Sequence, residues 1–112
     1  MAIVKFDPYI TDSLMRDLVG HDRRPVAFLV YLWLAAEQQR RQPVTASYSS
    51  LAESIGVSKS SVQAAIGWLA RRELISVRRS YATATPSYTV HTPWRGDPRP
   101  MRSRALRNSA TH

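Results

Sequence analysis

The sequence has no cysteine and no long hydrophobic run. The first absence excludes disulfides and cysteine-based metal sites, and it suits a reducing cytosol. The longest apolar run, Val26 to Ala36, has eleven residues. A membrane-spanning helix needs about 20, so this run predicts a buried helix. The opening MAIVKFDPYI lacks a long apolar segment behind a basic start, so no secretory signal is expected. These features favour a cytoplasmic protein with no membrane partner.

The patterns that support catalysis are also missing. His21, His91 and His112 are scattered without metal-ligand spacing. The sequence has no phosphate-cradling glycine loop, no G-x-S-x-G, and no obvious carboxylate pair in its apolar segments. We therefore expect no enzymatic activity, no metal and no cofactor.

Acidic residues are few: 8, against 16 Lys and Arg, for a net charge of +8. Residues 1–42 are nearly balanced at +1, residues 43–92 carry +3, and residues 93–112 carry +4. A positive surface confined to part of a small domain indicates a polyanionic partner, nucleic acid first and anionic membrane second. The alternative is a basic composition with no specific purpose.

The first half of the chain predicts an arm and two helices. Residues 1–10 suggest an extended arm, and Thr11 to Gly20 a short helix that Thr11 or Asp12 caps and Gly20 ends. Leu14, Leu18 and Val19 would form its apolar stripe. Pro25 fits the first turn of a longer helix, to about Gln42, that is apolar nearly all round and belongs in the core. Residues 1–22 thus form a segment before the main domain.

The second half predicts a short strand over residues 44–48, helices over 49–55 and 59–72, and two β-type runs. The turn-prone ATATP between LISVRRSY and PSYTVHT predicts a hairpin. The fold class is mainly α (α+β), a helical core with a C-terminal two-stranded hairpin. Residues 93–112 are expected to be a flexible basic tail, either a phosphate-binding arm or a solubility tail, although Trp94 has the character to pack onto the domain.

Residues Ser50 to Leu69, SLAESIGVSKSSVQAAIGWL, have the pattern of two helices crossing closely. Ala52 is small enough for the crossing, and Gly56 suits the positive φ of a sharp turn. Ser58 is placed to cap the second helix. Leu51, Ile55, Val57, Val62, Ile66 and Leu69 supply a continuous apolar face.

This helix pair, with REL-I and the hairpin after it, resembles the winged helix-turn-helix domain of bacterial DNA-binding proteins. The resemblance covers about residues 24–92, within an expected domain of 23–92, and extends to MarR- and GntR-type regulators and some plasmid and phage replication initiators. It implies sequence-specific binding of double-stranded DNA, with the second helix in the major groove. A small transcription regulator, such as a repressor, is the first interpretation. A replication or partition accessory factor, or a protein–protein interaction module, is the alternative.

Three groups of residues are candidates for contact with DNA. In the recognition helix, Gln63 is expected to read bases, and Lys59 to reach guanine or a phosphate. Serines at the helix starts suit phosphates, although capping explains any single one. The wing arginines are expected to meet phosphates or a minor groove, the alternative being a charged, solvated edge. The candidates are Ser58, Lys59, Ser60, Ser61, Gln63, Ala64 and Gly67; Ser47, Tyr48 and Ser49; and Arg78, Arg79 and Ser80.

The expected partners are DNA and a second copy of the chain. Tyr31, Trp33 and Trp68 are interpreted as core or interface residues rather than a ligand cage, and no small-molecule effector site is evident. The long helix is too apolar for so small a domain to cover, so residues 1–24 should cover it, within the chain or from a partner. A two-fold homodimer would place its recognition helices roughly 34 Å apart on a near-palindromic site. Such a protein is expected to be associated with the nucleoid.

Overall fold

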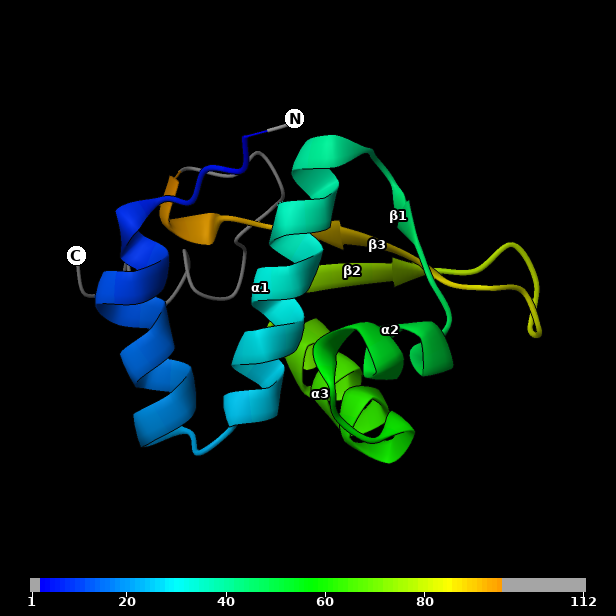
Figure 1. Cartoon of the computed structure of the whole chain (residues 1–112), viewed down its shortest axis with the longest axis horizontal. Helices are drawn as coiled ribbons and strands as arrows, with labels where there is room; N and C mark the ends of the chain where they lie inside the picture. Colours follow the sequence, from blue (N-terminus) through cyan, green and yellow to red (C-terminus); the bar gives the residue numbers. More distant parts are fainter. Residues whose placement is uncertain (1–2, 96–112) are drawn as a thin grey trace, which may run out of the picture.

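The computed structural model describes residues 3–95 (Figure 1). A helical segment runs from Pro8 to His21 and contains two π-helical stretches, η1 (Ile10–Leu14) and η2 (Arg16–His21). The other helices are α1 (Pro25–Arg40), α2 (Tyr48–Ile55) and α3 (Lys59–Arg71), and a short 3₁₀ turn follows at Pro93–Arg95 (η3). The strands are β1 (Val44–Thr45), β2 (Ile75–Arg78) and β3 (Ser87–Val90).

Helix α1 is the centre of the core, as its apolar sequence predicts. It packs against α3, β3 and η2, and buries Val30, Tyr31 and Leu34 completely. It ends at Arg40, two residues before the expected Gln42, where Arg41 takes an extended conformation. Its polar C-terminus is held by Glu37, whose carboxylate pairs with Arg40 at 2.7 Å and Arg41 at 3.6 Å.

The N-terminal helix starts earlier than expected. Asp7 caps it, because its Oδ1 accepts the Tyr9 N–H at 2.9 Å, and Thr11 and Asp12 therefore lie inside it. Residue Gly20 does not end the helix but lies within η2. The hydrogen bond from Asp22 N–H to Asp17 C=O, 2.8 Å, spans five residues, the π-helical spacing.

This helix covers α1 from within the same chain (Figure 1). Ile10, Leu14 and Leu18 are buried in the common core. Val19, expected on the same stripe, is instead 40% exposed. Four-residue spacing brings the three buried side chains onto one side, and Val19 falls beside that row.

The hairpin forms as predicted, but the sheet has three strands in the order β1-β3-β2, all antiparallel. Strand β1 pairs with the far side of β3, where Val44 lies opposite Tyr88. The strand is shorter than the predicted 44–48 because Ser47 is already the N-cap of α2. The expected mainly α (α+β) winged helix-turn-helix architecture is confirmed, with β1 as an added strand.

The chain closes on itself beyond β3. The Trp94 ring stacks on Tyr9 with centroids 4.5 Å apart, and its Nε1–H donates to Asp7 Oδ2 at 3.2 Å. Trp94 thus packs back onto the N-terminal helix, as its aromatic character suggested. The rest of the predicted basic tail, residues 96–112, lies outside the described residues.

Candidate nucleic-acid interface

The turn between α2 and α3 has the geometry that the sequence predicts. Gly56 adopts φ 92°, in the left-handed region, and its N–H donates to Ala52 C=O at 2.8 Å. A Cβ at Gly56 would meet no atom within 4 Å, so the requirement for glycine comes from the backbone alone. Ala52 is buried between the helices, so α3 is held against α2 by a small side chain and a left-handed turn.

Two of the predicted serines cap helices. Ser47 Oγ accepts the Ser50 N–H at 3.0 Å at the start of α2. Ser58 Oγ accepts the Ser61 N–H at 3.1 Å at the start of α3, as predicted, and donates to Ser61 Oγ at 2.8 Å. Ser60 Oγ lies 3.2 Å from Ser58 Oγ, so three hydroxyls gather at the exposed N-terminus of α3. Ser49 is exposed beside the α2 cap.

Helix α3 has two distinct faces. Val62, Ile66 and Leu69 are buried as predicted, together with Ala65 and Trp68. The opposite face exposes Lys59, Ser60, Gln63 and Ala64, with Gly67 half-buried.

Arg71 extends this exposed face. A Cβ built on Gly67 would lie 3.3 Å from Arg71 Nη1, which shows that the guanidinium folds back over the glycine. Residues 59, 63, 67 and 71 are four apart and so form one stripe. The residues predicted from the sequence for this face did not include Arg71, although the four-residue spacing was a signal for the stripe.

In the wing, Arg79 is held by internal contacts. Its Nη1 donates to Ala84 C=O at 2.8 Å across the loop, and its Nη2 donates to Tyr48 Oη at 3.3 Å. Its guanidinium also lies 5.7 Å from the centre of the Tyr48 ring. Arg79 therefore fixes the wing loop to the start of α2, a role that the sequence did not reveal.

Tyr88 anchors the wing strand β3 to the core. It is fully buried, and its Oη donates to Ala46 C=O at 3.2 Å. Burial raises the pKa of this phenol, the neighbouring Tyr48 adds to the rise, and Arg79 opposes it. All three wing candidates are exposed, but the Arg79 guanidinium is turned toward α2, whereas Arg78 and Ser80 lie along the strand and loop.

Some of the described Lys and Arg side chains are paired with carboxylates, and others are not. Arg16 pairs with Asp17, and Arg40 and Arg41 with Glu37. Arg72 lies 3.8 Å from Asp22 and over the Trp68 ring at 4.5 Å, which supports a structural role. Between residues 3 and 95, no carboxylate lies within 4.0 Å of Lys59, Arg71, Arg78 or Arg79 in the second half, nor of Lys5, Arg23 or Arg24 in the first.

Other kinds of site were also searched for. In the described part of the chain, no three His, Asp or Glu side chains are grouped to hold a metal ion. No helix among residues 3–95 is long and apolar enough to cross a membrane.

The comparisons with known proteins give one match. Residues 24–75 match a family model described as a helix-turn-helix domain. The matched segment begins just before α1 and ends at the start of β2, so it contains α1, α2 and α3 in full. No curated protein and no solved structure matches the chain significantly.

Proposed function

We propose that the helix-turn-helix domain at residues 24–75 binds double-stranded DNA in a sequence-specific manner, with α3 in the major groove. The observation that carries the proposal is the exposed face of α3. It presents hydroxyl, amide and cationic groups beside small residues, and no acidic residue lies between Ile55 and Leu69. A phosphate-lined groove attracts such a face and would repel carboxylates.

On this face Gln63 is the proposed base-reading residue. Its amide is exposed, and a glutamine can bond N6 and N7 of adenine together. Lys59, one turn earlier, reaches a guanine or a phosphate. Ala64 and Gly67 leave room for the helix to approach the base edges closely.

Serines and the wing are proposed to set the register on the phosphates. Capping uses the Ser47 oxygen as an acceptor, so its O–H proton remains available to a phosphate oxygen. The same is true of Ser61, which accepts the Ser58 proton and keeps its own. The proposed contacts are Ser60 and Ser61 at α3, Ser47, Tyr48 and Ser49 at α2, and Arg79 and Ser80 in the wing, while Ser58 holds Ser61 in place.

For the biological role, we favour a small bacterial transcription regulator, such as a repressor, acting on the nucleoid in the cytoplasm. A replication or partition accessory factor has the same requirements for DNA contact. The described α3 face offers a protein partner no large apolar anchor, which disfavours the protein–protein module.

We also propose that the protein acts as a homodimer. Three apolar side chains remain exposed on the N-terminal helix and α1, at 40–42% of their surface: Met15, Val19 and Leu29. A two-fold contact through this region would bury them and would require a near-palindromic binding site.

The test is selection of binding sites from random duplex DNA, followed by salt titration on the enriched sequence. We expect an enriched site whose affinity falls steeply with salt. Gln63→Ala should lose about 1–3 kcal/mol of discrimination between that site and a one-base variant, while keeping its non-specific affinity. The matched control is Gln42→Ala, an exposed glutamine in the turn after α1.

The other outcomes are equally clear. Salt-sensitive binding without an enriched site would refute sequence specificity and indicate an architectural role. Absence of binding near physiological salt would overturn the DNA-binding proposal and favour a protein partner. An enriched site without two-fold symmetry would contradict the dimer.

A further inference from the structure

The outer face of the sheet is polar by strand alternation. Ile75, Val77, Tyr88 and Val90 point toward the core side, so the residues between them point outward. The register places Arg78 opposite Ser87 and Ser76 opposite Thr89. On β1, Thr45 lies opposite Ser87, and their hydroxyl oxygens are 2.9 Å apart. Hydroxyls from all three strands therefore lie on the same face of the sheet as Arg78.

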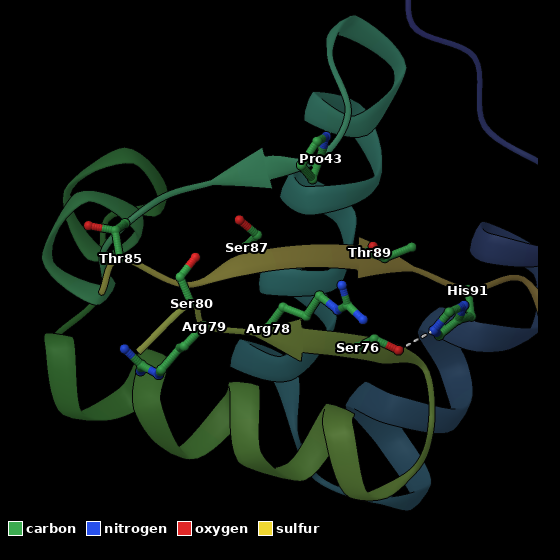
Figure 2. A pocket seen from close by; sticks show the side chains of 9 residues that line it. All are labelled: Pro43, Ser76, Arg78, Arg79, Ser80, Thr85, Ser87, Thr89 and His91. Atoms are coloured by element: carbon green, nitrogen blue, oxygen red, sulfur yellow. Dashed lines mark hydrogen bonds between the residues drawn. The ribbon is translucent and has the colours of Figure 1, made fainter. Parts of the chain in front are cut away.

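This face is hollowed, with a volume of about 820 Å³ (Figure 2). At one end, Ser76 Oγ lies 2.6 Å from His91 Nε2, which fixes the imidazole against the strand. Figure 2 shows the Arg78 side chain lying along the sheet toward this pair, whereas Arg79 leaves in the opposite direction. Arg78 thus lines the middle of the hollow, and His91 lines one end.

No carboxylate of the described residues lines the hollow. None of its nine lining residues is acidic: Pro43, Ser76, Arg78, Arg79, Ser80, Thr85, Ser87, Thr89 and His91. Among residues 3–95, no hydrogen bond or ion pair is recorded for the Arg78 side chain, whereas Arg79 is held by Ala84 and Tyr48. A guanidinium with free donors, in a hollow that serine and threonine hydroxyls also line, suits the oxygens of a phosphate.

We propose that this face, defined by Ser76, Arg78, Ser87, Thr89 and His91, is a second phosphate-binding surface for the DNA backbone. It deepens the proposed function and rests on it. The exposed stripe of α3 and the outer face of the sheet are different surfaces, so the phosphates held here belong to DNA flanking the bases that α3 reads. Arg78 is thereby assigned to the sheet face rather than to the wing contact at the site itself.

The chemistry favours a phosphodiester over other ligands. Serine and threonine hydroxyls and the imidazole donate or accept single hydrogen bonds, and Arg78 supplies the charge and a two-pronged donor. The lining has no Phe, Tyr or Trp ring on which an unpaired base would stack, and no large apolar side chain to anchor a protein. The hollow therefore suits contact with the DNA phosphate backbone, without recognition of bases.

The experiment compares Arg78→Gln with Arg16→Gln, which removes the same charge from the exposed face of η2. Each variant is titrated with a short duplex that ends at the borders of the selected site, and with a long duplex that extends about 10 base pairs, roughly one turn, beyond each border. We expect Arg78→Gln to reduce the salt slope by about 0.9 on the long duplex only, the value for one phosphate. Its affinity for the long duplex should fall about two- to fivefold at low salt.

Every outcome is decisive. Equal losses on both duplexes would place Arg78 at the primary site and overturn the second surface. No change on either duplex, or the same change in Arg16→Gln, would also overturn it. Failure of the wild-type protein to bind either duplex would instead refute the proposed function. Arg78 has no recorded internal partner, so the variant should unfold at the wild-type temperature, and a thermal scan verifies this.

Discussion

Replacing Gly67 with alanine should stabilise the fold and weaken DNA binding at the same time. Gly67 lies inside α3 with a helical backbone, where alanine is favoured over glycine by about 0.8–1.0 kcal/mol. The new methyl would meet Arg71 Nη1 at 3.3 Å. That atom is the end of a long flexible side chain, so a shift of a few tenths of an ångström relieves the contact at little cost.

The net expectation is a gain of about 0.5–1 kcal/mol in the free energy of unfolding. For a domain of this size, that raises Tm by about 3–6 °C. DNA binding should move the other way, because the methyl stands on the face proposed to enter the groove. Loss of close approach should cost about 1–2 kcal/mol, roughly 5- to 30-fold in affinity.

Gly20→Ala is the matched control. Gly20 also lies within a helical segment, η2, where it is exposed and a Cβ would meet no atom within 4 Å. It should raise stability by a similar amount and leave DNA affinity unchanged. Urea denaturation and a fluorescence binding assay measure both quantities on the same samples. If Gly67→Ala lowered the free energy of unfolding, the reasoning about packing would be refuted. If Gly67→Ala and Gly20→Ala both bound DNA with the wild-type affinity, the placement of Gly67 in the groove would be refuted.

Two further predictions concern the fold. Gly56→Ala should lower the free energy of unfolding by about 1–2 kcal/mol, because alanine would have to adopt φ 92°. Urea denaturation measures this, and a variant as stable as the wild type would contradict the need for glycine at the turn. Tyr88→Phe should cost about 1 kcal/mol near neutral pH, through the lost hydrogen bond to Ala46 C=O. Because burial raises the Tyr88 pKa in the folded state, the unfolded phenol ionises first, near pH 10, so this stabilisation is complete below pH 10 and is lost as pH rises above it. The difference in unfolding free energy between wild type and Tyr88→Phe should therefore shrink from about pH 9 to pH 11, and a constant difference would contradict the assigned pKa direction.

The helix pair is the part of the molecule that could be predicted from local signals. The cap at Ser58, the left-handed turn at Gly56 and the buried row of Val62, Ile66 and Leu69 each depend on residues within a few positions of one another. Such interactions depend only on residue type and spacing, so they can be predicted without information about the rest of the fold. The same holds for the apolar α1 and for the hairpin.

The predicted ends of the first helix were wrong because a neighbouring residue offered another cap, or because the glycine did not require a helix end. Asp7 caps the first helix in place of Thr11 or Asp12, because Pro8 directly after it is suited to the first helical turn. Gly20 was expected to end that helix, but its φ is not in the left-handed region and the helix continues through it. A glycine permits a helix end without requiring one.

The sequence by itself therefore determined the helix pair, the core helix and the acid-free face of α3. Only the tertiary structure decided how the sheet is completed and what the wing arginines face. Strand β1 pairs with β3 across more than 40 positions, and only this register places Thr45 beside Ser87. Arg79 bonds to Tyr48, 31 positions away, while its neighbour Arg78 points into the polar hollow. The reason is that strand alternation separates neighbours onto opposite faces, whereas partners across strands are chosen by how the whole chain folds back.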